Sequence, residues 1–265
     1  MTDANGGSDN RFFALSWPLD SYRARMREFN DRKTGGKAYS LWATRYWWIY
    51  ECMREELAAR GNLTIADLGA KSGVLKRFAG DMPGCGWLGL GWGLDDGLLR
   101  GMGYDRSVVC DFDQPLPLED ESVDFAAFSH VIEHLPRPEF SMREIARVLR
   151  PGGLLAALSP VKPYPVSVLS EKRYERRLKS GKAKRGGHIH AFNAGGWRRL
   201  VKKTGLTLEK LGGSYLLRSA KNPLEQYAWW FRLNHLWGAL FPSLGNEIFV
   251  AARKGDAPRR TGKEA

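Results

Sequence analysis

The sequence predicts an α/β fold built on a mostly parallel β-sheet. From Leu63 onward, short apolar runs typical of strands alternate with helical segments, the pattern of parallel strands joined by right-handed crossovers. The first run leads, within residues 64–80, through a glycine-containing turn into an amphipathic helix. The last two runs, residues 206–211 and 247–252, are expected to form an antiparallel pair.

The chain begins with segments that lie outside this alternation. Residues 1–10 are rich in Gly, Asn, Asp and Ser and are expected to be disordered. Residues 12–30 mix aromatic side chains with Arg at irregular spacing, whereas residues 38–60 predict a clear helix. The apolar face of that helix is expected to pack against the main domain, although such a face can also cap a ligand pocket.

The centre of the chain carries most of the predicted sheet. The expected elements are strands at 64–68, 86–90, 107–110, 125–128 and 154–158, and helices at 74–79 and 139–149. The second helix is followed by Arg-Pro-Gly-Gly, which is a typical stop signal. The stretch between the second and third strands is short and glycine-rich, so no helix is predicted there.

The last third of the chain contains a predicted helix at 194–204 and two unusual segments. Residues 172–185 carry eight basic residues and one acid, a run that is usually a solvated face or a flexible loop. Residues 227–241 are rich in aromatic side chains and are expected to be helical in part. This aromatic segment fits either core packing or contact with a membrane interface.

Composition narrows the class of protein. The 265 residues are 43% hydrophobic, which is ample for a packed core, and Lys plus Arg outnumber Asp plus Glu by 41 to 29. The net charge of +12 favours nucleic acid, anionic lipid or phosphorylated partners without choosing among them. An apolar leader and an 18-residue apolar run are both absent from the sequence, which predicts a cytoplasmic protein, and three distant cysteines argue against a disulfide framework or a thiolate zinc site.

The turn after the first strand is a candidate cofactor site. Asp67, Gly69 and Gly73 form a D-x-G-x-x-x-G pattern, in which glycine allows a left-handed backbone and a close approach to a ligand. The spacing differs from that of dinucleotide-binding folds, because Lys71 stands where a second glycine is expected. Strand-glycine-helix turns also occur as plain packing devices.

A second stretch makes the family resemblance specific. Residues 108–160 closely resemble class I S-adenosylmethionine-dependent methyltransferases, in particular the group that includes the ubiquinone and menaquinone methyltransferases. Four features in order carry the resemblance: Asp111 after the third strand, the acidic 116–124 segment, the Val-Ile-Glu-His-Leu turn at 131–135, and the helix end at 147–153. It covers residues 63–159, with weaker agreement at 188–211 and 246–254.

The resemblance implies a fold and a division of the chain. The fold is a Rossmann-like class I methyltransferase sheet, mostly parallel with a C-terminal antiparallel strand and with helices on both faces. An N-terminal extension, 1–60, would precede a methyltransferase domain at 61–254 with insertions at about 160–187 and 212–245. Residues 255–265 would form a disordered tail.

The resemblance also implies a site for S-adenosyl-L-methionine. The loop from Asp67 through Gly69 and Lys71 to Gly73 would hold its methionine portion, Asp111 and Phe112 would lie beside the adenine, and Ser129 would lie under the methyl group. The family usually has an acid at the end of the second strand, which binds the ribose. This sequence has none near Gly91, and Asp95 or Asp96 from the following loop could substitute.

Two histidines are candidate catalytic residues. His130 and His134 follow the fourth strand, and a neutral imidazole can accept a proton from a hydroxyl acceptor at pH 7. A structural role for His134 is the alternative. The H-x-x-E-H pattern resembles that of inverted zinc proteases, but it falls at a strand end rather than on a helix, so no metal is predicted. A lid is also possible, formed by Tyr164, Tyr174, His188 and His190.

These observations favour an enzyme that transfers a methyl group to a small-molecule, glycan-linked or lipid-linked acceptor, at oxygen. A nucleic-acid methyltransferase is the first alternative, because the chain is basic; the base-reading N-P-P-Y pattern is absent after the fourth strand. The second alternative is a non-catalytic protein of this fold that binds a membrane surface. The acceptor and the oligomeric state are not readable from the sequence.

Overall fold

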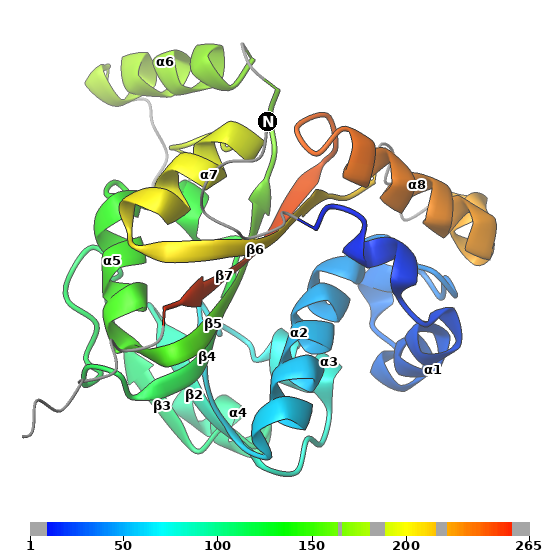
Figure 1. Ribbon diagram of the computed structural model, residues 1–265, viewed down its shortest axis with the longest axis horizontal. Coiled ribbons are helices and arrows are strands. Elements are labelled where there is room, and N and C mark those ends of the chain that lie inside the picture. The colour runs from blue at the N-terminus through cyan, green and yellow to red at the C-terminus, as the bar shows by residue number, and fades with distance from the viewer. Residues whose placement is uncertain (1–9, 164–165, 181–188, 216–221, 256–265) are drawn as a thin grey trace, which may run out of the picture.

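A seven-stranded sheet forms the centre of the molecule. The computed structural model describes residues 10–163, 166–180, 189–215 and 222–255. The strands lie in the order β3-β2-β1-β4-β5-β7-β6 (Figure 1). They are β1 (Leu63–Leu68), β2 (Cys85–Gly91), β3 (Arg106–Val109), β4 (Val123–Ser129), β5 (Leu149–Pro160), β6 (Leu206–Gly213) and β7 (Glu247–Lys254).

The direction of the strands follows the prediction. β1 to β5 pair in parallel, whereas β7 pairs antiparallel with both β5 and β6. The strand order reverses between β1 and β4, which are neighbours in the sheet. Ligands of open α/β sheets bind outside the carboxyl ends of the strands at such a point.

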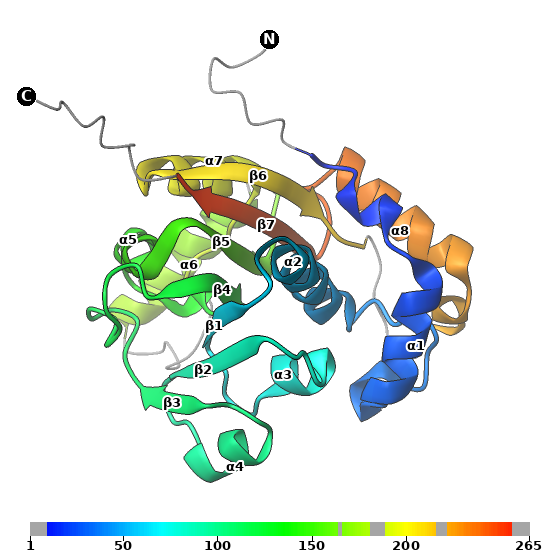
Figure 2. The same ribbon diagram turned by 60° about the horizontal axis from the view of Figure 1, so that its bottom comes forward.

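Helices cover both faces of the sheet, as predicted (Figure 2). One face carries α5 (Pro138–Val148) and α7 (Ala194–Lys203), whose apolar side chains pack on β4, β5 and β7. The other carries α1 (Leu19–Phe29), α2 (Thr44–Arg60), α3 (Val74–Ala79), α4 (Asp96–Gly101) and α8 (Ala228–Leu240). The remaining helices are α6 (Val166–Lys179) and the 3-10 turns η1 (Phe13–Ser16), η2 (Arg32–Thr34), η3 (Ile132–His134) and η4 (Pro223–Gln226).

The N-terminal extension is part of the main core. Trp47 and Ile49 of α2 are fully buried, and Trp42 packs on Phe29 of α1 with 6.3 Å between the ring centroids. The predicted packing of this face is therefore confirmed. Residues 12–30, whose aromatic side chains follow no regular spacing, form η1 and α1. Both elements bury aromatic side chains in the core.

Two local expectations need correction. The stretch between β2 and β3 does contain a helix, α4, whose first turn is capped by the Asp95 carboxylate accepting from the Leu98 amide at 3.0 Å. The Arg-Pro-Gly-Gly stop signal does end α5, but β5 starts at once at Leu149 rather than five residues later. The described part of the basic segment, residues 172–180, lies almost wholly in α6 with its basic residues exposed where described, which agrees with the expected solvated face.

The remaining expectations fare as follows. The β6–β7 hairpin is confirmed, and the aromatic segment 227–241 is largely α8. Cys52 is buried and Cys85 and Cys110 are half-buried free thiols. The expected disorder of residues 1–10 and 255–265 falls outside the described part of the chain except at the two inner ends, where the amide of Asn10 donates to the carbonyl of Glu209 at 3.3 Å and Gly255 follows β7. Among the described helices, none has the length and apolar character that crossing a membrane demands.

Candidate functional site

The turn between β1 and α3 holds three strand ends together. Gly69 and Gly73 have φ of 94° and 63°, in the left-handed region that favours glycine. A Cβ on Gly69 would come within 2.5 Å of Val131 Cγ2, beyond the end of β4. The amides of Gly69 and Ala70 both donate to the carbonyl of Leu90, at 2.7 and 3.1 Å. The glycines of this turn therefore allow the ends of β1, β2 and β4 to converge.

Asp67 is a buried carboxylate next to this turn. Its side chain is near the carboxyl end of β1, and the residue is only 6% exposed. The hydroxyl of Tyr104 donates to Asp67 Oδ2 at 2.6 Å. Burial raises the pKa of Asp67 to about 6, against the opposing effect of this hydrogen bond. Tyr104 was missed in the sequence, because it lies 37 residues away and belongs to no motif.

The two departures from the family pattern are visible in the structure. Lys71 is exposed and has a φ of 45°, which is costly for a residue other than glycine. Asp95 caps α4, while Asp96 accepts from Ser107 Oγ at 2.5 Å and pairs with Arg100 at 2.8 Å. Both candidate substitutes for the ribose acid are thus engaged at α4. Their role toward a ribose stays a prediction.

Asp111 and Phe112 follow β3 at the same edge of the sheet. Asp111 is exposed, and its Oδ1 accepts from the amide of Asp113 at 2.9 Å. Phe112 is 8% exposed, and its ring meets that of Phe128 edge-on with 6.1 Å between centroids. The carboxylate is accessible, whereas the aromatic ring belongs mainly to the core.

His130 lies between two buried carboxylates. It follows the half-buried Ser129 at the end of β4 and has a φ of 54°. Its Nδ1 is 3.3 Å from Glu133 Oε1, and its Nε2 is 3.2 Å from Glu247 Oε1. Burial opposes the charged ring, but the two carboxylates prevail and raise the pKa of His130 above its usual value of 6.5. This environment favours the imidazolium, which cannot accept a proton.

Glu247 and Arg45 complete this cluster and were missed in the sequence. Glu247 begins β7 and is 2% exposed, and it forms an ion pair with Arg45 of α2. Burial would raise the pKa of Glu247, but Arg45 and His130 hold it below the usual value. The pair joins the N-terminal extension to the sheet edge. A lone acid before the apolar strand 248–252 is the one signal that could have indicated it.

His134 is the more accessible of the two predicted catalytic histidines. It ends η3, its side chain is 29% exposed, and its Nε2 lies 3.8 Å from Glu133 Oε1. The amides of Ile189 and His190 both donate to the carbonyl of Glu133, at 2.7 and 3.1 Å. His190 is therefore close to η3, as a lid would require.

The other predicted lid residues are not seen next to η3 in the described part of the chain. Tyr174 is half-buried on α6, and Tyr164 and His188 lie outside the described residues. Within the described ranges, no group of three or more metal-ligating side chains comes together. The lid stays a prediction.

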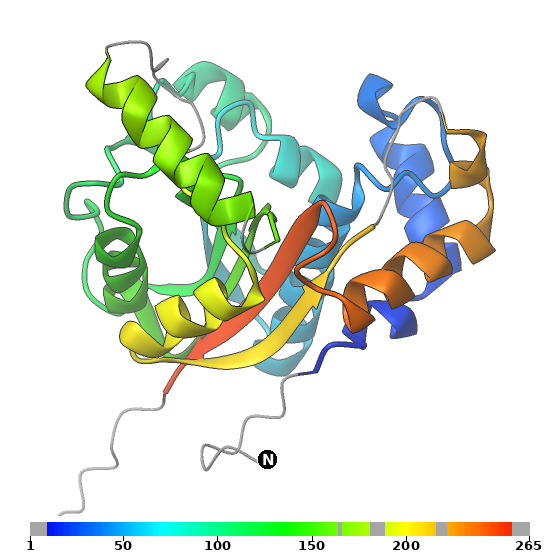
Figure 3. The same ribbon diagram turned by 90° about the horizontal axis from the view of Figure 1, so that it is seen from above.

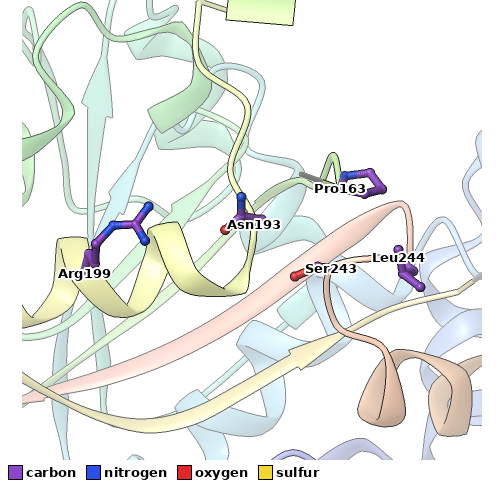
Figure 4. A pocket seen from close by; sticks show the side chains of 5 residues that line it. All are labelled: Pro163, Asn193, Arg199, Ser243 and Leu244. Atoms are coloured by element: carbon purple, nitrogen blue, oxygen red, sulfur yellow. The ribbon is translucent and has the colours of Figure 1, made fainter. Parts of the chain in front are cut away.

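One hollow lies near α7 and not at the predicted cofactor loop. It has a volume of about 370 Å³, and Figure 4 shows its lining residues near the start of α7 and in the connection before β7. There the hydroxyl of Ser243 accepts from the amide of Ala194 at 3.1 Å. None of the residues predicted for the cofactor or for proton transfer lines it.

Comparison with known families and curated proteins supports a methyltransferase domain. The methyltransferase domain family matches residues 98–157. An uncharacterized methyltransferase from Mycobacterium ulcerans (strain Agy99) is 38% identical over 106 residues, which are 37% of this chain and 41% of that protein. The chain thus matches about two fifths of the length of this relative.

Solved structures support the fold. A candidate sarcosine dimethylglycine methyltransferase from Galdieria sulphuraria is 22% identical, with a TM-score of 0.53 over 78% of this chain and 85% of that one. The [4+2]-cyclase SpnF is 15% identical, with a TM-score of 0.53 over 78% of this chain and 80% of that one. The fold is therefore that of Rossmann-like class I methyltransferases, and it also serves an enzyme named for a different reaction.

Proposed function

We propose that this protein is an S-adenosyl-L-methionine-dependent methyltransferase that acts on a small-molecule, glycan-linked or lipid-linked acceptor, at oxygen. The observation that carries the proposal is the convergence of the β1, β2 and β4 ends around Gly69, next to the buried Asp67. The family match at residues 98–157 supports it independently. The ubiquinone- and menaquinone-type resemblance belongs to the same proposal.

The residues at this edge fit the cofactor. Gly69 and Gly91 let the ends of β1 and β2 approach closely: a Cβ on Gly91 would lie 3.5 Å from the Gly69 Cα. Asp67 has a carboxylate that is costly to keep charged without a ligand, as its raised pKa indicates. Asp67 and Lys71 would bind the amino-acid end of the cofactor, and Asp111 would accept from the adenine amine. We assign the ribose to no residue.

Methyl transfer asks little acid-base chemistry of the protein. When bound, S-adenosyl-L-methionine would supply a methyl group on a sulfonium sulfur: the acceptor oxygen attacks the methyl carbon, and the sulfur leaves as a neutral thioether. Ser129 and Val131 at the end of β4 would align the acceptor and exclude water. His134 would accept the acceptor's hydroxyl proton, because its ring is accessible. His130, held between Glu133 and Glu247, would position η3 rather than act as the base.

Calorimetry with S-adenosyl-L-homocysteine tests the cofactor site directly. The purified full chain is expected to bind it, and Asp67→Asn is expected to weaken binding at least about tenfold, as loss of a charge-assisted contact does. Asp20→Asn, a change at an exposed acid of α1, serves as the matched control and should bind normally. Absence of binding by the unaltered protein would overturn the proposal.

The acceptor class is tested with the methyl-labelled cofactor. The protein is incubated with separated lipid, aqueous small-molecule and RNA fractions, and the label is followed into each. Label in the lipid or small-molecule fraction supports the proposal. Label in RNA alone would favour the nucleic-acid alternative. The exposed basic side chains of α6 are the observation that motivates this alternative.

A further inference from the structure

The outer face of α8 is apolar along its whole length. Trp229, Leu233, Leu236 and Leu240, here called the α8 stripe, recur at i, i+4, i+7 and i+11 and so lie on one side of the helix. Their side chains are 39–55% exposed. All exposed residues of this 13-residue helix belong to the stripe, and none carries a charge. Surface helices normally present polar residues on that side.

The stripe is a rigid feature, because the opposite face of α8 is anchored. Phe231 and His235 are buried in the core, and Arg232 donates to the carbonyls of Leu15 and, at 2.7 Å, Trp17. The single charged side chain of α8 is therefore used within the fold. The stripe cannot turn inward without breaking this anchor.

A basic helix lies on the same side of the molecule. In Figure 1 α6 stands at the top and α8 at the upper right, and in Figure 3, seen from above, β7 passes between them. The exposed residues of α6 include Lys172, Arg173, Arg176 and Arg177, together with Leu169, which is 64% exposed. In the chain α6 follows β5 and α8 precedes β7, so both helices adjoin the edge of the sheet where β5 ends and β7 begins. Positive charge and exposed apolar side chains thus occur on two helices next to the same edge.

A lipid surface fits this combination better than a second copy of the chain. A stable protein interface takes roughly 20–30 residues from each partner, and a helix about 20 Å long with a four-residue stripe supplies far fewer. Trp and Leu side chains enter the boundary between headgroups and acyl chains without needing a partner of matching shape, and nearby Lys and Arg bind anionic headgroups.

We propose that α8 and α6 together dock the protein on an anionic membrane surface, with the α8 stripe inserted among the lipids. The candidate site lies at the carboxyl ends of the parallel strands, the edge at which β5 also ends, so the acceptor would be a lipid or a lipid-linked molecule in that membrane. The choice of acceptor rests on the proposed methyltransferase function; the docking itself does not.

Vesicle flotation tests the docking. The full chain is mixed with vesicles of phosphatidylcholine alone or of phosphatidylcholine with phosphatidylglycerol, at low and high salt. Binding is expected to the anionic vesicles and to fall as salt rises. The double variant Leu233→Gln/Leu236→Gln is expected to reduce partitioning roughly tenfold or more, because two apolar anchors are lost. Arg173→Glu/Arg176→Glu should abolish the preference for phosphatidylglycerol.

The controls separate docking from folding and from cofactor binding. Leu98→Gln removes a 41% exposed leucine from α4 and should float like the unaltered protein. All variants should keep the S-adenosyl-L-homocysteine affinity of the unaltered protein. Failure of the protein to float, or equal flotation of the Leu233→Gln/Leu236→Gln variant, would overturn the docking. The docking would also be overturned if the unaltered protein is a dimer and the Leu233→Gln/Leu236→Gln variant is a monomer, or if the protein binds RNA but not vesicles. Loss of cofactor binding with flotation intact would instead overturn the methyltransferase proposal.

Discussion

The Glu247 cluster gives the sharpest stability prediction. Glu247→Gln keeps the size of the side chain, so no cavity forms, but it removes the charge that pairs with Arg45 and His130. The Glu247 side chain is 3% exposed and that of Arg45 14%, so the guanidinium would be left almost buried without its partner. Breaking a buried ion pair in this way costs about 3–5 kcal/mol. This is a large share of the roughly 5–15 kcal/mol that stabilises a typical domain.

The pH dependence of this loss has a definite shape. The pKa of Glu247 is lowered on folding, so its contribution is present above the usual value of 4.5 and is lost as pH falls through the folded value. The pKa of His130 is raised, so its contribution is complete below 6.5 and is lost as pH rises through the folded value. The difference between the two proteins should therefore be largest between pH 4.5 and 6.5.

Urea unfolding followed by tryptophan fluorescence, repeated from about pH 4 to pH 9, measures this difference. Glu55→Gln is the matched control, because Glu55 pairs with Lys210 at 2.5 Å but its side chain is 59% exposed. That variant should lose less than about 1 kcal/mol at any pH. A loss of under about 1 kcal/mol for Glu247→Gln at pH 5.5, or one that does not vary with pH, would refute the reasoning.

Three further predictions concern the turn after β1. Asp67→Asn should leave the free energy of unfolding at pH 7 unchanged or higher by up to about 3 kcal/mol, since a pKa raised to about 6 means that the charged form is disfavoured in the fold; thermal unfolding shows whether stability falls instead. Gly69→Ala should cost about 2 kcal/mol or more in urea unfolding, because its Cβ meets Val131, whereas Gly61→Ala, with φ of 80° and open space, should cost only about 1 kcal/mol. Lys71→Ala should weaken S-adenosyl-L-homocysteine binding up to about tenfold in low salt and leave stability within about 0.5 kcal/mol; unchanged calorimetry would mean that Lys71 only faces solvent.

Much of the fold was readable from the sequence because its signals are local. The strands from 64 to 158 are short apolar runs bounded by turns, and the hairpin at the end shows the same pattern. The helix α4 was missed because its six residues, Asp-Gly-Leu-Leu-Arg-Gly, are too few for a periodicity and contain two glycines. Its stability comes from the Asp95 cap and the buried Leu99, which only the tertiary structure reveals.

Some residues of the candidate site could likewise be found from the sequence, and others could not. The Asp67 to Gly73 turn and the residues after β3 and β4 were found as motifs, since each lies in one short stretch of chain. Arg45 and Glu247 are 202 positions apart and belong to no pattern that a single sequence can display. Glu247 also lies 3.2 Å from His130 and helps to raise the pKa of that histidine, an effect that the local sequence around His130 does not reveal.

The place of β7 in the sheet determines when this sheet can form in full. Among the described strands β7 is synthesised last, yet it lies between β5 and β6 and pairs with both. Until residue 254 has left the ribosome, β6 has no neighbour in the sheet and Arg253 cannot join Glu56 of α2 to Glu209 of β6. Until then, the edges of β5 and β6 that pair with β7 lack a partner strand. A premature stop before residue 247 would leave these two edges able to pair with strands of other chains.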